Sequence, residues 1–245
     1  MTSRRTLTVG LTAAALLLTP AAVAVGGSAP STTGATERLG VTQAAEQAAK
    51  RRDTNIRFLS FDHTKPHMAR ARVKGQVTVQ TPAGRRAVKG LWVRLYRKFN
   101  GSNGWDLIAG KRVGRGAYAR FVFRPQARAN ARYKVNFRGN SRLSGSNGVT
   151  SVLVHRRFDP TLADGTGRFH GHMSPRYRHR FVILQKRACG RCSWEPVRGD
   201  RTDRRSNWDF KVSAPRHGRW WWRVTTAPTP RFIRSSSGVF TTERA

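Results

Sequence analysis

The chain has 245 residues, which allows one or two domains, and 47 lysines and arginines against 12 acidic residues give it a formal net charge of +35. A field of that size attracts polyanions such as nucleic acid, acidic glycans, teichoic-type polymers or anionic lipid. The basic residues are spread over the whole chain, which is equally the pattern of a generally basic surface. The few carboxylates form no close pair in a motif suited to glycoside hydrolysis, which excludes that class.

The first 24 residues have the layout of a secretory signal peptide. Arg4 and Arg5 form a basic head, residues 7–18 are apolar, and Ala22-Val23-Ala24 is a small-x-small cleavage signal. The apolar stretch is too short to cross a membrane. We therefore expect residues 1–24 to be a cleaved signal, and the protein to be secreted, with no membrane span. Residues 3–7 also resemble a twin-arginine signal, so the export route stays open.

Residues 25–54 predict a flexible leader. They are poor in large apolar side chains and rich in alanine, glycine, serine and threonine. Residues 42–50 could form a short helix, but that helix would have no apolar face to bury.

From Ile56 onward the sequence pattern is typical of β-structure. In residues 70–79, Ala71, Val73, Gly75, Val77 and Val79 alternate with polar residues, as in a half-buried strand. Similar runs follow at 91–98, 105–108, 118–123, 133–137 and 149–155, and a Gly/Asn/Ser turn cluster fills 100–104. Short strands without a convincing helix predict an all-β sandwich.

The strand pattern then repeats at an offset of 89 residues. Residues 91–98 match 180–187, Trp105 matches Trp194, and Tyr133 matches Trp222. The same offset relates Phe121 to Phe210. Upstream, residues 73–77 match 169–173 at a different offset, of 96 residues. We infer two tandem β-sandwich domains, at 55–157 and 158–245. Residues 158–161, which include Pro160, are expected to form a short joint in a semi-rigid rod.

Each copy resembles the bacterial Ig-like repeat domains of secreted actinobacterial proteins. The resemblance rests on a glycine in the second strand, a V-x-L-Y/Q-R third strand, a tryptophan opening the fourth, and later aromatic strands. These features are Gly75 and Gly171, residues 93–97, Trp105 and Trp194, residues 121–125, and residues 133–135. The family implies spacers, stalks or binding modules. It supplies no catalytic residues and no cofactor.

Cys189 and Cys192 are the only cysteines, in a CxxC run that we place in a hairpin of the second copy. In an oxidising compartment a disulfide that pins the turn is the simplest interpretation. Redox activity and half of a metal site are the alternatives.

His170 and His172 form an HxH pair on one strand. Period-two alternation places both rings on one face, as in some metal sites. The matching residues of the first copy are Lys74 and Gln76, so a solvated face is the default interpretation, and no metal site is assigned.

The run Trp220-Trp221-Trp222 is the most unusual feature of the chain. Trp222 matches a core position, so Trp221 should point outward between Arg219 and Arg223. It could stack on a sugar or a base, or it could lie beneath an arginine in a cation–π contact.

We expect a non-catalytic, monomeric secreted module that associates with anionic polymers of the cell envelope or cell wall, without specific nucleic-acid binding. The expected outward-facing ligand residues are Trp221, Arg72, Lys74, Arg94, Lys134, Arg180, Lys186, Arg219 and Arg223. Two alternatives remain: a structural or adhesion module whose charge is incidental, and a secreted enzyme with a cleft where the domains meet.

Overall fold

The computed structural model describes residues 51–116 and 118–244, within one compact unit at residues 47–245. The expected signal peptide at 1–24 and most of the expected leader at 25–54 lie outside the described residues. The described part consists of strands and turns, without a helix. The all-β class expected from the sequence is confirmed.

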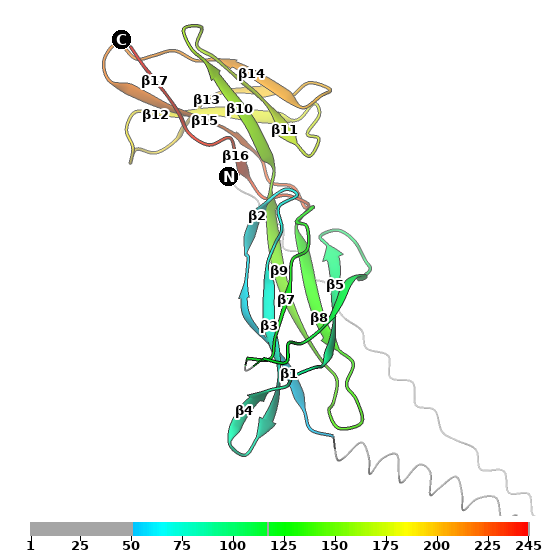
Figure 1. The fold of residues 1–245 in the computed structure, drawn as a ribbon. Helices are drawn as coiled ribbons and strands as arrows, with labels where there is room; N and C mark the ends of the chain where they lie inside the picture. Colours follow the sequence, from blue (N-terminus) through cyan, green and yellow to red (C-terminus); the bar gives the residue numbers. More distant parts are fainter. Residues whose placement is uncertain (1–50, 117, 245) are drawn as a thin grey trace, which may run out of the picture. The chain divides into compact units, whose positions relative to one another are not determined.

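Two sheets enclose the first hydrophobic core (Figure 1). One contains β1 (Thr54–Phe61), β3 (Val73–Thr81), β4 (Gly84–Ala87) and β7 (Arg120–Phe123). The other has the order β2 (Thr64–Pro66), β9 (Ser146–His155), β8 (Ala131–Phe137), β5 (Trp92–Phe99) and β6 (Asp106–Arg112). Alternate residues of these strands are buried, because successive side chains of a strand point to opposite faces.

Two further sheets enclose a second core. One has the order β10 (Arg157–Ala163), β11 (Arg168–Ser174) and β14 (Asn207–Lys211). The other has the order β13 (Glu195–Arg201), β12 (Phe181–Arg187), β15 (Arg219–Thr226) and β16 (Ser235–Ser236), and β17 (Phe240–Glu243) also pairs with β15. Phe169 and Met173 are fully buried here, as the alternation of β11 predicts.

The two pairs of sheets share pairing details at the 89-residue offset. The β5–β6 pair has a register shift after Leu95, and the β12–β13 pair has one after Leu184. A β-bulge of this kind inserts an extra residue at a defined place. Leu95 pairs with Val135 and Leu184 with Val224, so the partner strands also agree.

One sequence match is wrong by two residues. Gly75 pairs with Phe121, and the corresponding Gly171 pairs with Trp208. Trp208, rather than the expected Phe210, therefore occupies the place of Phe121. In both pairs the aromatic ring packs over the glycine, where a β-carbon would lie within 3 Å of a ring atom.

The expected joint at 158–161 is also wrong. These residues lie inside β10, where Pro160 pairs with Gly171. Only Arg156 separates β9 from β10, and in Figure 1 the chain runs from one strand into the next. Pro160 is tolerated because β10 is the edge strand of its sheet.

The loop between β15 and β16 packs against the end of β8 and β9. The N–H of Asn130 donates to the carbonyl oxygen of Arg231 (2.8 Å), and its Nδ2 donates to that of Pro230 (3.2 Å). Its Oδ1 accepts from the N–H of Val154 (2.7 Å), and Phe232 joins Val154 in a small apolar cluster. The loop is therefore held by both polar and apolar contacts.

The cysteine pair forms a disulfide, as expected. The Sγ atoms of Cys189 and Cys192 are 2.12 Å apart, and both residues lie between β12 and β13. The bond closes the turn of the hairpin, which is the structural interpretation of the CxxC run.

Candidate anion-binding sites

Six of the expected ligand residues occupy outward positions, five of them on strands and Arg72 directly before β3. Arg94 and Lys134 alternate with buried residues on β5 and β8, and Arg219 and Arg223 do so on β15. Arg72 and Lys74 flank buried Val73. The pKa of Lys74 is lowered, first by the positive charge of Arg120 and then by burial and by Arg72. The strand pattern therefore predicted the orientation of these six side chains.

Two expected ligand residues lie elsewhere. Lys186 pairs with buried Trp222, and its Nζ lies 4.1 Å from the ring centroid of Trp220. It therefore covers the end of the core instead of facing outward from the sheet. Arg180 precedes β12 and lies in a loop, where it lines a cavity described below. Lys186 has the same parity as buried Val182 and Leu184, so alternation along β12 itself places it on the core side. Arg180 lies outside the strand, where alternation does not apply.

Several outward cations are engaged by aromatic rings of the protein. Lys134 Nζ lies 4.6 Å from the ring centroid of Trp105, and Arg223 Cζ lies 4.2 Å from that of Trp194. Arg187 also contacts Trp194, at 4.6 Å. Such contacts fix the direction of the cation. The hairpin tryptophans are thus covered by cations at matching positions.

The tryptophan run divides between the two faces of β15. Trp222 is buried, and its Nε1 donates to Thr242 Oγ1 (2.8 Å); Trp220 meets it edge-on at 5.8 Å. Trp221 is half-buried on the other face, opposite Arg187 and Thr241 in the neighbouring strands. Among the described residues, a cation of the protein lies over Trp220 and none lies over Trp221, so the interpretation of Trp221 as a covered ring is not supported.

Arg219 is held by an ion pair. Its Nε and Nη2 donate to Glu243 Oε2 at 2.8 and 2.6 Å. The nine expected ligand residues also belong to different sheets of the molecule. They are therefore distributed over its surface and do not form a single site.

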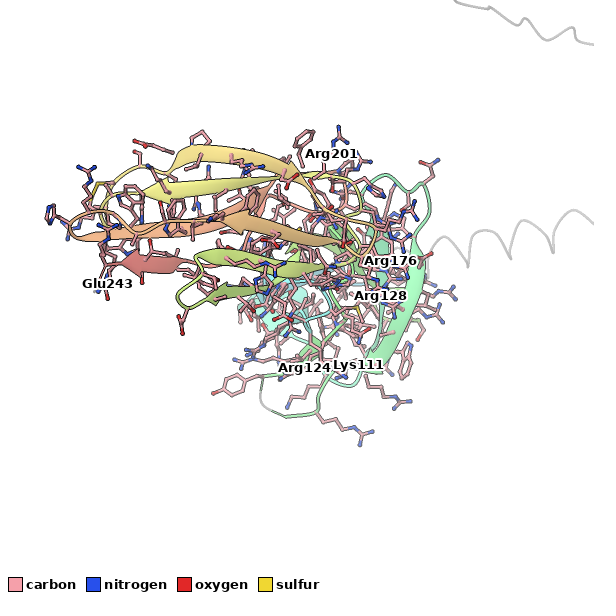
Figure 2. The ribbon with its side chains drawn as sticks, turned by 90° about the horizontal axis from the view of Figure 1, so that it is seen from above. Lys111, Arg124, Arg128, Arg176, Arg201 and Glu243 are labelled. Carbon is pink, nitrogen blue, oxygen red and sulfur yellow. A yellow bond between two sulfur atoms is a disulfide. The ribbon has the colours of Figure 1, made fainter. Side chains whose placement is uncertain are left out.

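A cavity that sequence reasoning missed lies where the loop after β15 meets the ends of β9 and β10. It has a volume of about 1080 Å³. Six arginines line it: Arg128, Arg156, Arg176, Arg178, Arg180 and Arg231. The other lining residues are His67, Asn100, Gly101, Pro175, Tyr177, Pro228, Thr229, Pro230 and Phe232, without a carboxylate among them. We call this space the arginine cavity; Figure 2 labels Arg128 and Arg176, which lie close together in that view.

Arg156 is the most buried of these arginines, with 7% of its surface exposed. Its Cζ lies 4.5 Å from the ring centroid of Tyr177 and 4.2 Å from that of Phe232. Nη1 donates to the carbonyl oxygen of Pro175 (3.2 Å), whereas buried Nε has no hydrogen-bond partner among the described residues. Burial is the largest cause that lowers the pKa of Arg156, and Arg180 lowers it further.

His67 adds a titratable group to the arginine cavity. Its Nδ1 lies 3.4 Å from Ser174 Oγ, and its ring meets that of Phe232 edge-on. Burial, followed by the charges of Arg156 and Arg128, lowers the pKa of this imidazole. The histidine therefore tends to be neutral in an otherwise cationic cavity.

The sequence carried one signal of the arginine cavity. Residues 176–180 read Arg-Tyr-Arg-His-Arg, a local concentration of arginine just before β12. The other lining arginines come from distant loops and strand ends, so only the folded chain brings them together.

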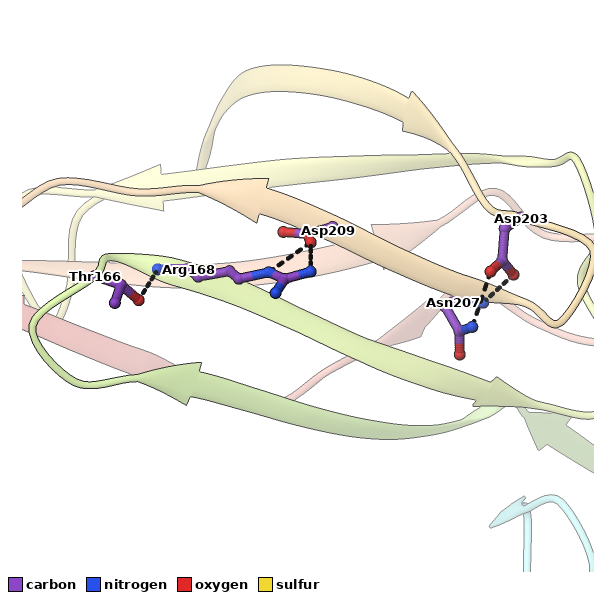
Figure 3. Close-up of polar contacts among 5 residues, drawn as sticks. All are labelled: Thr166, Arg168, Asp203, Asn207 and Asp209. Carbon is purple, nitrogen blue, oxygen red and sulfur yellow. Dashed lines mark hydrogen bonds and ion pairs between the residues drawn. The ribbon is translucent and has the colours of Figure 1, made fainter.

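Acidic residues gather in a second cavity, of about 590 Å³, beside β10, β11 and β14. Its lining includes His170, His172 and four aspartates, Asp159, Asp200, Asp203 and Asp209, together with Arg168 and Arg201. In Figure 3, Arg168 pairs with Asp209, and Asn207 donates to Asp203. The backbone hydrogen bond from Asn207 is the first cause that holds the pKa of Asp203 below its usual range.

The HxH pair gives no support to a metal site. Within the described ranges, no three or more histidine, cysteine, aspartate or glutamate side chains are arranged to hold a metal ion. His172 is exposed and His170 is half-buried, as expected for residues on the outer face of a sheet. Among those same residues, no helix is long and apolar enough to cross a membrane.

Comparison with known proteins yields no family. No family model matches the chain, and no curated protein matches it. One solved structure that it resembles is the sulfur carrier protein SoxY from Chlorobium limicola f thiosulfatophilum. The likeness covers 49% of this chain and 97% of that chain, at 14% identity and a TM-score of 0.28. A likeness this distant carries no argument about this chain.

Proposed function

We propose that this protein is a secreted, non-catalytic module of two tandem Ig-like sandwiches that associates with anionic polymers of the cell envelope. The observation that carries the proposal is the shortage of internal counter-charges. Four lysine or arginine residues pair with a carboxylate in the part of the chain that the structure describes: Lys65, Arg97, Arg168 and Arg219. Most of the cationic surface therefore remains available to an external polyanion.

The tandem arrangement is supported by the shared register of the two pairs of sheets. Matching shifts follow Leu95 and Leu184, and Gly75 and Gly171 each face an aromatic ring. We attribute these matches to duplication of one domain. Two linked copies would double the basic surface presented to a long polymer, which raises avidity without any new kind of contact.

The test is retention of the purified chain on an immobilised polyanion at increasing salt. We expect strong retention at low salt and a linear fall of log affinity with log salt concentration, because binding releases counterions. Retention that is the same at low salt and at about 1 M salt, where the Debye length is about 3 Å, would contradict the proposal. A salt wash of the secreting cells tests the same property at the cell envelope.

The alternative of a structural module with incidental charge makes the opposite prediction for surface variants. A triple variant Arg72→Gln/Arg94→Gln/Arg132→Gln removes cations from outward positions and leaves the ion pairs of Lys65, Arg97, Arg168 and Arg219 intact. If the charge is functional, the triple variant should reduce the slope of log affinity against log salt concentration by up to about three, which is about one for each lost phosphate contact. An unchanged slope and unchanged envelope association would favour the structural module.

The alternative of an enzyme requires a cleft, and the arginine cavity supplies one. Its lining offers arginines, His67 and Tyr177, without a carboxylate or a cysteine. Guanidinium groups bind and orient anions but do not exchange protons near neutral pH, so among the described lining residues His67 is the one side chain suited to acid–base chemistry there. Six guanidinium groups around one imidazole favour binding of an anion.

A further inference from the structure

The structure assigns the arginine cavity as a discrete binding site for phosphate-type groups carried on a larger molecule. This inference rests on the proposed affinity for anionic polymers. It goes further, because it separates one built site from the diffuse attraction of the whole surface.

The charge of the cavity lacks a counter-charge within its own walls. Its six arginines come from four places in the chain, and the walls contain no carboxylate. Like charges gathered in a partly enclosed space repel each other, and the repulsion strengthens as water is displaced. After burial, the charge of Arg180 also lowers the pKa of Arg156. A bound anion would remove the repulsion.

The surroundings of Arg156 orient its guanidinium and, within the described chain, leave one buried donor without an acceptor, as expected at a site for an oxyanion. The rings of Tyr177 and Phe232 cover its guanidinium, at 4.5 and 4.2 Å. Cation–π contacts engage the positive charge of the guanidinium, and its N–H groups still need oxygen acceptors. Nη1 is taken by the carbonyl of Pro175, and Nε is buried without a partner among the described residues. An unmade hydrogen bond in a buried, charged donor is costly.

The remaining arginines favour a phosphate-type group over a single carboxylate. Guanidinium forks match the paired oxygens of either anion. A phosphate has more oxygens, pointing in several directions, so more than one fork can bind it at once. Exposed Arg128, Arg176, Arg178, Arg180 and Arg231 supply further forks around the same space.

The size and walls of the cavity indicate that the phosphate belongs to a larger ligand. A volume of about 1080 Å³ is at the upper end of small-molecule sites and far exceeds one ion. Pro175, Pro228 and Pro230 line it together with the two aromatic rings. These surfaces suit the carbon skeleton of a polyol or a sugar.

The first measurement is isothermal titration of the purified full chain with inorganic pyrophosphate at about 0.15 M salt, where surface charges are partly screened. We expect one saturable site per chain. The variant pair Arg128→Gln/Arg180→Gln should weaken binding about tenfold or more, since each lost guanidinium removes a charged hydrogen bond. The matched pair Arg57→Gln/Arg86→Gln removes the same charge from exposed positions on β1 and β4, and it should weaken binding less than about twofold.

Arg156 needs a gentler change because it is buried. Arg156→Lys keeps the charge but removes the planar fork, and we expect it to weaken pyrophosphate binding while the thermal transition of the free protein shows that the fold is retained. If Arg156→Lys unfolds the chain, the exposed pair Arg128→Gln/Arg180→Gln still decides the question.

Two phosphate sources are distinguished by further titrations. Glycerol 3-phosphate carries a terminal phosphate, and a glycerol phosphate oligomer carries internal diesters. One of the two compounds should bind more tightly than pyrophosphate. If that binding is lost in Arg128→Gln/Arg180→Gln and kept in Arg57→Gln/Arg86→Gln, the result supports the site and identifies the kind of phosphate that it binds.

The contrary results are equally clear. Non-saturable binding of pyrophosphate, or equal weakening by the two variant pairs, would mean that only the diffuse field acts, and the discrete site would be rejected. The proposed association with polyanions would still hold if retention on the polyanion column depends on salt. That proposal is rejected separately if retention does not change with salt.

Discussion

The side chains that define this protein are cations placed against aromatic rings. Lys134 lies over Trp105, Arg223 over Trp194, and Arg156 between Tyr177 and Phe232. Each contact orients a charge that would otherwise be mobile on a long side chain. The contacts at Trp105 and Trp194 cover the hairpins, whereas that of Arg156 holds a buried charge in the wall of a cavity. Residue type alone does not distinguish these two roles.

His67 makes stability depend on pH in a defined window. Burial, Arg156 and Arg128 lower its folded-state pKa below the unfolded value of 6.5, and the groups that face it also include Ser174 Oγ and the ring of Phe232. As pH falls through 6.5, the unfolded chain takes up this proton first, so stability falls until the lowered folded-state pKa is passed. Above pH 6.5 both states carry a neutral His67, and the loss disappears.

We therefore expect the wild type to lose stability relative to His67→Gln as pH falls from about 7.5 to about 5. Urea unfolding of both proteins across that range measures the difference. Other histidines and the carboxylates titrate in both proteins and cancel. A difference in free energy of unfolding that stays constant with pH would show that His67 has the same pKa in both states.

At the scale of strands, a glycine next to an aromatic ring sets the packing of each core. A β-carbon at Gly75 would lie 2.5 Å from Phe121 Cζ and 2.6 Å from the carbonyl oxygen of Arg57. At Gly171 it would lie 2.5 Å from the carbonyl oxygen of Asp159 and 2.8 Å from Trp208 Cζ2. The requirement for glycine is one of space, since neither position has a positive φ.

Gly75→Ala and Gly171→Ala should each destabilise the protein by about 1 to 3 kcal/mol, since a well-packed core must shift to admit the methyl group. Gly104→Ala is the control, because a β-carbon there has no neighbour within 4 Å, and it should change stability by less than about 0.5 kcal/mol. Chemical denaturation of the three variants gives the comparison. Equal effects at all three positions would show that backbone entropy, and not packing, explains the glycines.

The junction of β9 and β10 shows how one strand position can create a site. Arg156 has the same parity as buried Val152 and Val154, so alternation directs its side chain inward. Its N–H donates to Ser235 Oγ, and its guanidinium lies against the rings of Tyr177 and Phe232, which belong to other segments.

At the scale of the whole molecule, charge is abundant but unevenly distributed. Six arginines line one cavity without a carboxylate, while four of the 12 acidic residues line the cavity beside β11. Elsewhere the cations are spread over the outer faces of several sheets. The molecule thus combines a diffuse basic surface with one concentrated basic cavity and one acidic cavity.

A net charge of +35 should also make stability depend on salt. Self-repulsion destabilises a compact, highly charged state, and salt screens it. We expect the melting temperature to rise between about 0.01 and 0.15 M sodium chloride, by about 2 to 4 °C for each 1 kcal/mol gained. A calorimetric series in sodium chloride measures this. A falling melting temperature would mean that internal ion pairs outweigh the repulsion.

The amino-acid sequence by itself determined the strand class, the buried faces and the hairpin disulfide. These features are local: alternation has a period of two residues, and the cysteines are three positions apart. It correctly placed Trp222 in the core and Arg94, Lys134 and Arg219 on outer faces. Sequence reasoning misplaced Lys186, which shares the face of buried Val182 and Leu184. It also misplaced the joint at 158–161, which lies inside β10 because that strand pairs with β11.

Only the tertiary structure decided where the charges meet. Arg128, Arg156, Arg180 and Arg231 are far apart in the chain, and no spacing rule relates them. They line one cavity because the loop after β15 is fastened to Asn130 and Val154. Nor could the sequence tell a guanidinium stacked over Trp194 from one between Tyr177 and Phe232. Burial separates these two roles, because 7% of Arg156 is exposed whereas Arg223 is half-buried, and burial is a property of the folded chain.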